Sequence, residues 1–228
     1  MVAKFLALLL ALIPTLTFAF PSTPILDTFD RTDEDPITGI WTNGTSSGTG
    51  QCSVSSNLAV GGGSTDDCYT TKTYGATQEV YASIPNATTM TEDDNLLILL
   101  CLQGTFGSTS INGYAIKVRR RAGLNDQIEI VRMTNGYTGL TTLGSGWSAG
   151  EFSSGLKVGL RREASGSLSL YYDPNGASGW TLIETVTGAT TYACGNTSLG
   201  LELGGANHSV NDFGGGSPIG TFSIIQAR

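Results

Sequence analysis

Apolar and polar residues alternate with a period of two along most of the chain, in runs separated by glycine, asparagine, proline and aspartate. Alternation of this kind places successive side chains on opposite faces of a β-strand. The runs recur at spacings of about 8–12 residues, which is typical of β-sandwiches, and predict roughly twelve strands. The clearest of them span residues 95–103, 113–121, 127–133, 156–162, 167–173, 180–187, 199–204 and 221–226.

Turn sequences between these runs predict how the strands pair. Residues 164–166 and 173–176 suit tight turns, because proline fixes φ and asparagine and glycine accept positive φ. Consecutive strands joined by short turns are antiparallel. Residues 96–102 are apolar on both faces, so we expect a central strand that is covered on each side. The sequence thus predicts an all-β, two-sheet antiparallel β-sandwich.

The first nineteen residues have the features of a secretory signal peptide, with one lysine, an apolar run over residues 5–16 and small residues before a cleavage position after Ala19. The run is shorter than the roughly 20 apolar residues that a membrane-spanning helix needs. We expect residues 1–19 to be removed and residues 20–228 to form one secreted, extracellular domain without stable membrane insertion. Retention as an anchor is the alternative, because a proline and two aromatic residues lie near the cleavage position.

Composition narrows the function classes. The chain has 12 basic and 19 acidic residues, and only 14% of its residues are charged, against about 25% in average proteins. An acidic protein without a basic tail is a poor ligand for a polyanion, so we expect no nucleic-acid partner. A polar surface with few charges, rich in glycine, serine and threonine, suits an extracellular protein.

Four cysteines in an oxidising compartment indicate two disulfides. Three connectivities are open to four cysteines, and the sequence alone does not choose among them. We favour Cys52 with Cys68 and Cys101 with Cys194, because a turn at residues 61–64 would join strands that begin at Cys52 and Cys68. A zinc site is disfavoured, since the cysteines lack the close spacing of zinc ligands and the chain has a single histidine.

Motifs spread over the chain resemble those of concanavalin A-like (laminin G-like) jelly-roll modules of secreted and phage proteins. A D-x-F-x-R opening lies at Asp27, Phe29 and Arg31, and a tryptophan follows it. Further matches, in the family's order, are residues 112–116, 156–172, 180–183, 195–202 and 210–213. The resemblance implies two sheets of about six or seven strands, with a first strand near residues 27–29 paired to a last strand near residues 222–225. Family members are mostly carbohydrate-binding modules, lectin-like domains, glycosidases or lyases, so the fold does not fix the function.

Retaining glycosidases of this family have two glutamates and an aspartate at alternating positions of one strand, a motif that this sequence lacks. The contiguous Glu92, Asp93 and Asp94 predict a solvated turn, with a calcium or ligand loop as the alternative. A Ser-His-Asp triad would need His208, which we expect to be an exposed loop histidine. We therefore predict no catalysis and keep a polysaccharide hydrolase or lyase as the second alternative.

Alternation also separates charged from apolar side chains on several consecutive strands. If these strands share one sheet, its outer face presents forked donors, a carboxylate and an aromatic ring, which are the groups that contact sugars. The predicted ligand-binding residues of this strip are Lys117, Arg119, Glu129, Lys157, Arg161 and Tyr171. Its basic character favours uronate or sulfate groups. The alternative is a solvated face with weak cross-strand ion pairs.

Two further groups of residues are candidates. Trp147 lies in a glycine-rich loop at residues 143–150, where the indole is either tucked under the loop or displayed for stacking on a sugar. Asp27, Asp30 and Asp212 lie in the first and near-last family motifs, which the implied fold brings close, and calcium binds clusters of carboxylate oxygens. Turns stabilised by Asx hydrogen bonds are the alternative role of these three aspartates.

Four N-x-S/T sequons mark surface acceptors if the host glycosylates the protein, at Asn43, Asn86, Asn196 and Asn207. The composition and cysteines equally fit a structural subunit of an extracellular surface, filament or virion. In that case residues 20–24 are either a donor strand for self-assembly or a linker. We conclude from the sequence that the chain is a secreted non-catalytic module whose partner is a carbohydrate or glycoconjugate, with the structural subunit as the first alternative.

Overall fold

A computed structural model describes residues 19–43, 51–61, 66–104, 111–136, 139–203 and 208–218. Within these ranges the chain is almost entirely β-structure, with one short 3₁₀ turn, η1 (Ala87–Thr89). No helix in the described ranges is long and apolar enough to span a membrane. The strand predicted at residues 221–226 lies outside the described residues.

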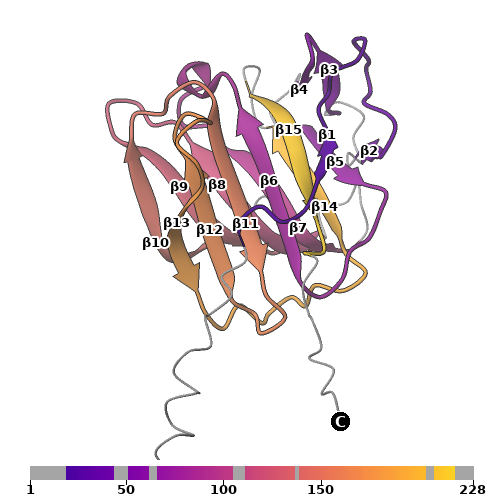
Figure 1. Ribbon diagram of the computed structural model, residues 1–228, viewed down its shortest axis with the longest axis vertical. Coiled ribbons are helices and arrows are strands. Elements are labelled where there is room, and N and C mark those ends of the chain that lie inside the picture. Colours follow the sequence, from indigo (N-terminus) through magenta and orange to yellow (C-terminus); the bar gives the residue numbers. More distant parts are fainter. Residues whose placement is uncertain are drawn as a thin grey trace, which may run out of the picture.

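Two antiparallel sheets face each other, with the 8-stranded sheet in front in Figure 1 and the 7-stranded sheet behind it. The prediction of a two-sheet β-sandwich is therefore confirmed. The 8-stranded sheet has the order β13 (Thr181–Val186), β12 (Leu168–Asp173), β11 (Leu156–Arg162), β6 (Gln78–Ile84), β15 (Ser209–Gly216), β4 (Leu58–Val60) and β3 (Ser53–Ser55), with β1 (Ile25–Asp27) beside β15. The 7-stranded sheet has the order β10 (Leu140–Gly150), β9 (Asp126–Met133), β8 (Asn112–Arg119), β7 (Leu96–Gln103), β14 (Ser198–Leu203), β5 (Asp66–Thr70) and β2 (Trp41–Asn43).

The main core lies between the sheets and follows from the alternation. In β7, Leu96, Ile98 and Leu100 belong to this core, while Leu97 and Leu99 belong to a second apolar cluster. All five side chains are fully buried. The expectation of a central strand covered on both faces is thus confirmed.

The first described strand pairs with the last one, as the family resemblance implies. Ile25 lies opposite Gly214 and Asp27 opposite Phe213. The partner strand is β15, and the last strand that the resemblance implied near residues 222–225 lies outside the described residues. Trp41 lies 5% exposed in the core, with its ring 4.9 Å from that of Phe213.

Both predicted disulfides are present, Cys52–Cys68 and Cys101–Cys194. The geometric reason given for the first pair was wrong. Cys52 precedes β3, which pairs with β4 in the 8-stranded sheet, whereas Cys68 lies within β5 of the 7-stranded sheet. The bond therefore links the two layers instead of closing a hairpin.

Strand β10 was predicted as a glycine-rich loop. It pairs with β9 over its length, with irregularities between Leu143 and Trp147 and between Ser148 and Gly150. Gly144 and Gly146 have φ values of 79° and 67°, a left-handed conformation that glycine adopts without steric cost. These two positions break the alternation, which hid the strand from a period-two reading of the sequence.

Candidate functional site

The predicted charged strip is divided between two faces of the molecule. Strands β8 and β9 lie in the 7-stranded sheet, whereas β11 and β12 lie in the 8-stranded sheet. The assumption of one shared face was therefore wrong, because the chain crosses between the sheets after β10. Alternation correctly predicted the outward side of each strand but contains no information on which sheet the strand joins.

On the 8-stranded sheet, Arg161 and Tyr171 of the strip are covered by other residues. The Arg161 guanidinium is buried and donates to Glu79 from Nε at 2.9 Å and from Nη2 at 2.6 Å. Tyr171 stacks on Phe20 with ring centroids 4.0 Å apart. Lys157 on the same strand as Arg161 is half-buried. Arg161 and Tyr171 thus contact the chain's own N-terminal segment.

The part of the strip on the 7-stranded sheet consists of cross-strand ion pairs. Lys117 lies opposite Glu129 and forms an ion pair with it. Glu129 also accepts a hydrogen bond of 3.0 Å from the Thr142 hydroxyl. Arg119 Nη2 lies 3.0 Å from Asp93 Oδ1. The Arg119 side chain is partly exposed and the Asp93 side chain is largely exposed. Lys117, Arg119 and Glu129, the strip residues on this sheet, are therefore each paired with an opposite charge.

A cavity of about 360 Å³ lies at the turn between β8 and β9. We call it the β8–β9 cavity; it is lined by Thr88, Glu92, Arg120, Arg121, Gly123, Leu124, Asn125, Asp126, Glu151 and Phe152. The Asp126 carboxylate joins two segments of the cavity lining. It accepts the Arg121 backbone N–H at 2.9 Å and the Phe152 backbone N–H at 2.6 Å. Its volume lies within the range of about 300–1,000 Å³ that is usual for small-molecule sites.

The cavity lining combines unpaired polar groups with apolar surface. Among the described residues, the side chains of Arg121, Asn125 and Glu151 have no hydrogen-bond or ion-pair partner. Leu124 is 57% exposed and adds an aliphatic surface to this lining. A guanidinium donor, an amide, a carboxylate acceptor and an aliphatic surface can together contact hydroxyl groups and a sugar's C–H face. Sequence reasoning missed these residues because they lie in the turns after β8 and β10, where no periodicity marks a site.

A second cavity, of about 240 Å³, lies beside His208 and Ser209. His208 is fully buried, so the expectation of an exposed loop histidine was wrong. Burial lowers the pKa of His208 below its ordinary value, although Asp94 acts in the opposite direction. The imidazole is therefore biased toward its neutral form.

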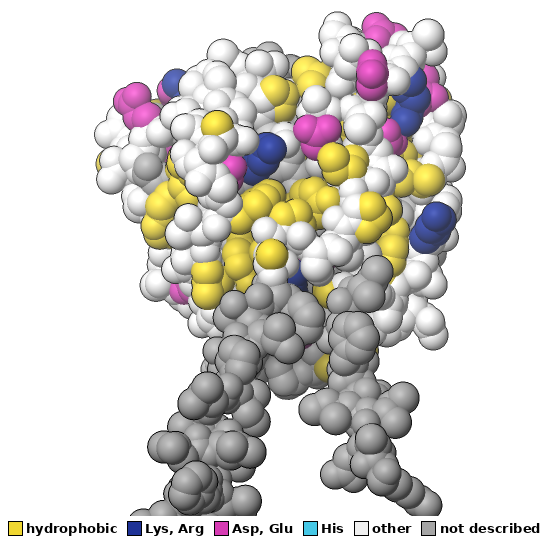
Figure 2. All heavy atoms as spheres, in the orientation of Figure 1, with side chains coloured by type: hydrophobic (Ala, Val, Ile, Leu, Met, Phe, Trp, Pro, Cys, Tyr) yellow, Lys and Arg dark blue, Asp and Glu magenta, His cyan; other side chains and the backbone are white. Residues whose placement is uncertain are grey.

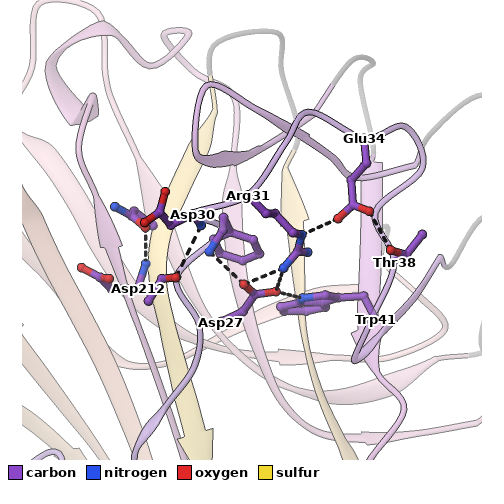
Figure 3. A network of polar contacts seen from close by, with 10 residues as sticks. Asp27, Asp30, Arg31, Glu34, Thr38, Trp41 and Asp212 are labelled. Atoms are coloured by element: carbon purple, nitrogen blue, oxygen red, sulfur yellow. Dashed lines mark hydrogen bonds and ion pairs between the residues drawn. The ribbon is translucent and has the colours of Figure 1, made fainter.

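The three aspartates predicted to bind calcium do not form one cluster. Figure 3 shows Asp27 directed toward Arg31 and Trp41, with Asp30 and Asp212 on the other side of the network. The Asp27 carboxylate accepts two bonds from Arg31 Nη1, at 2.9 and 2.8 Å, and one from Trp41 Nε1 at 2.7 Å. It also accepts the Phe29 N–H, which is an Asx turn.

These contacts give Asp27 a structural role. The Arg31 cation already neutralises the Asp27 carboxylate, and its oxygens accept four hydrogen bonds from three donor groups. No group of three histidine, cysteine, aspartate or glutamate side chains in the described part of the chain could hold a metal ion. The residues present at this position therefore do not fit a calcium ion.

Trp147 and three of the sequons lie within the described residues. The indole of Trp147 packs against the core, with its ring 4.3 Å from that of Tyr172, so it is tucked in and not displayed. Asn86 and Asn196 are exposed, and Asn43 is half-buried in β2. Asn207 lies outside the described residues.

Glu202 lies on the outer face of the 7-stranded sheet, opposite Asp67 of β5. Its side chain is buried. Burial raises the pKa of Glu202 well above its ordinary value, and the carboxylates of Asp67, Asp66 and Asp94 raise it further. Glu202 is thus a carboxyl group that favours its neutral form in the folded protein.

Comparison with known proteins gives matches among solved structures. No protein-family model and no curated protein sequence matches the chain. The VIP36 exoplasmic/lumenal domain, in its Ca²⁺/Man2-bound form, matches with a TM-score of 0.58 and 10% identity over 89% of this chain and 90% of that one. The Emp46p carbohydrate recognition domain, in its potassium-bound form, matches with a TM-score of 0.55 and 12% identity over 89% of this chain and 100% of that one.

Identities this low show a shared fold and no more. The match extends over nearly the whole length of both neighbours. It agrees with the resemblance found in the sequence motifs, since both neighbours are jelly-roll lectin domains. The chain therefore has the concanavalin A-like jelly-roll fold.

Proposed function

We propose that the chain is a secreted, non-catalytic carbohydrate-binding domain whose ligand occupies the β8–β9 cavity. The observation that supports this proposal most is the set of unpaired polar side chains, Arg121, Asn125 and Glu151, around an exposed aliphatic surface. A sugar offers hydroxyls that both donate and accept, so it can satisfy a guanidinium, an amide and a carboxylate together.

The charge distribution favours a neutral sugar over an anionic one. Lys117 is paired with Glu129, Arg119 with Asp93, and Arg120 with Glu92 at 3.3 Å. The basic residues of the strip that lie on the 7-stranded sheet, Lys117 and Arg119, are thereby neutralised. A mixed lining of arginine and glutamate disfavours a ligand of either charge.

The structural neighbours support a carbohydrate ligand and suggest a first sugar to test. The VIP36 domain has been solved with mannose-containing ligands and Ca²⁺. We propose a neutral hexose such as mannose as the ligand class for this chain, and calcium dependence as part of the test. The aspartates that we expected to bind calcium do not fit it, so calcium-independent binding is compatible with the proposal.

A glycan array screened with the purified protein, with and without calcium, tests this function. We expect saturable binding to one class of neutral glycan. Glu151→Gln and Asn125→Ala should each weaken binding about tenfold, as expected for the loss of one hydrogen bond of about 1.4 kcal/mol.

Glu163→Gln is the matched control, since Glu163 is another exposed carboxylate, on the turn between β11 and β12. Its binding should equal that of the wild type. Absence of binding to any glycan would contradict the function. Binding that neither Glu151→Gln nor Asn125→Ala weakens would contradict the site and leave the function in place.

A further inference from the structure

A row of residues crosses the outer face of the 8-stranded sheet, each opposite the next in strand register. The row, which we call the aromatic row, consists of Leu182, Tyr171, Gly159, Tyr81, Gly214 and Ile25. Figure 2 shows hydrophobic side chains gathered in a band over this face. Within the described ranges, two of the three exposed large hydrophobic residues, Ile25 at 48% and Leu182 at 53%, are the ends of the row.

The two glycines make hollows in this face. A Cβ atom on Gly159 would lie 2.3 Å from Phe20 Cζ, and one on Gly214 would lie 2.1 Å from Tyr81 Cζ. Real Cβ atoms do not approach other atoms this closely. The Phe20 ring thus occupies the space above Gly159, and the Tyr81 ring occupies the space above Gly214.

Phe20 is held on three sides in its hollow. Its ring stacks on Tyr171 with a centroid separation of 4.0 Å and an interplanar angle of 3°. Trp180 contacts it edge-on at 5.0 Å, and the Arg161 guanidinium lies 5.4 Å from the ring centroid. Such aromatic and cation–π contacts are geometrically specific.

The residues after Phe20 are bound through their backbone. Glu79 accepts the Ser22 N–H at 2.7 Å and the Thr23 N–H at 2.6 Å, and Arg161 orients this carboxylate from the other side. Tyr81 donates its hydroxyl to the Thr23 carbonyl at 2.8 Å. Burial raises the pKa of Tyr81 to about 12, so the hydroxyl stays protonated for this bond.

Residues 20–23, which we call the arm, are therefore recognised as a peptide ligand is: by an aromatic pocket, two backbone N–H groups and one carbonyl. The connection from the arm to β1 is weaker. Pro24 and Ile25 are both exposed, and the Pro24 carbonyl accepts a long bond of 3.4 Å from Gly215. Phe20, Thr23 and Pro24 do not belong to the main core, so release of the arm by rotation about the ψ angle of Pro24 would leave β1 paired and that core intact.

We propose that the aromatic row is a peptide-binding groove that also receives the arm of a second copy of this chain. Every copy has an identical arm and groove, so exchange makes the same contacts as the folded-back arrangement. Two copies packed face to face would have their sheets about 10 Å apart. An arm of four residues plus Pro24 reaches about 17 Å when extended, which is enough to span that gap. The exposed Ile25 and Leu182 would be buried in the same contact.

This groove is independent of the proposed carbohydrate site. The β8–β9 cavity is formed at the end of the 7-stranded sheet, and the aromatic row lies on the outer face of the other sheet. Exchange of arms would link copies while both cavities stay open. Failure of one proposal would therefore leave the other intact.

Mixing two variants tests the exchange. Phe20→Ala removes the ring from the arm and leaves the hollow above Gly159 empty. Gly159→Ala fills the groove and leaves the arm intact, because the new Cβ would be within 3.0 Å of the Phe20 ring alone, with Tyr81 Cβ at 3.1 Å. In sedimentation, we expect each variant alone to be a monomer and the equimolar mixture to form a 1:1 complex.

A mixture that sediments as two monomers would overturn the proposal. If Gly159→Ala does not fold, a peptide with the sequence of residues 20–24 replaces it as the donor of the arm. Calorimetric titration of this peptide into the Phe20→Ala chain should show saturable 1:1 binding, and the peptide with alanine in place of phenylalanine should not bind. Equal heats from the two peptides, or none from either, would likewise overturn the proposal.

Discussion

The outer faces of the two sheets use the same residue types in opposite ways. On the 8-stranded sheet, Arg161 and Glu79 form a buried ion pair beneath the N-terminal arm, with side chains 7% and 0% exposed. On the 7-stranded sheet, Arg119 and Asp93 form a similar pair with side chains 34% and 58% exposed, beside an open cavity. The two ion pairs thus differ in burial and not in residue type. The buried pair is a structural contact, whereas the exposed pair lies on a surface that a ligand can reach.

The largest expected effect is the difference in unfolding free energy between variants that lack one or the other acidic partner, Glu79 or Asp93. Glu79→Ala would leave the Arg161 cation buried without its partner, which costs about 3–5 kcal/mol of unfolding free energy. Asp93→Ala removes a solvent-exposed partner and should cost less than about 1 kcal/mol. Urea denaturation of both variants measures the two values. Similar losses for the two variants would show that burial is not the decisive difference.

A second prediction concerns the fit of Phe20 over Gly159. In the wild type, Gly159→Ala should cost about 1–3 kcal/mol, because the added methyl group overlaps the Phe20 ring. In a Phe20→Ala background the same change should cost less than about 0.5 kcal/mol, since the overlapping ring is gone. Thermal unfolding of the four proteins completes this double-mutant cycle. Additive costs would contradict the proposed packing of the arm.

A smaller effect is expected at Glu202 on the 7-stranded sheet. Its pKa is raised in the folded protein above the ordinary value of 4.5, so the folded state binds its proton more tightly than the unfolded state. Stability from this group is therefore greatest below about pH 4.5 and falls as the pH rises toward the raised pKa. Glu202→Gln should raise stability at pH 7 by on the order of 1 kcal/mol and change little at pH 4.

Denaturant unfolding at the two pH values checks this prediction. Asp67→Asn is a useful companion variant, because Asp67 contributes to the raised pKa of Glu202 and its removal should reduce the pH dependence. A Glu202→Gln variant that is equally stabilised at both pH values would contradict the sign of the shift.

The sequence predicted the fold well where alternation is regular. Strand β11 has the predicted bounds, because its alternation is regular. Strand β7 was correctly predicted to be central, because a long apolar run must be covered on both faces. Strand β10 was missed because glycines in a left-handed conformation interrupt its period. The Cys52–Cys68 bond was favoured because of a hairpin that does not form, so this correct pairing did not rest on the right geometry.

The candidate site was harder to predict for a physical reason. Alternation shows that Lys117 and Lys157 point outward, but the sheet that each strand joins depends on long-range packing. The residues of the β8–β9 cavity lie in turns, where no periodicity distinguishes a ligand site from ordinary solvated surface. The contact of Phe20 with Arg161 joins positions 141 residues apart, and nothing in the local sequence indicates it.

The most direct test of the proposed division between the faces is NMR chemical-shift mapping during titration with a neutral glycan found on the array. We predict saturable shifts confined to residues around the β8–β9 cavity, residues 120–126 and 151–152, and no shifts at Phe20, Tyr171 or Trp180. Shifts centred on the aromatic row would show that the glycan displaces the arm, and would contradict the assignment of the open end of the 7-stranded sheet as the binding site.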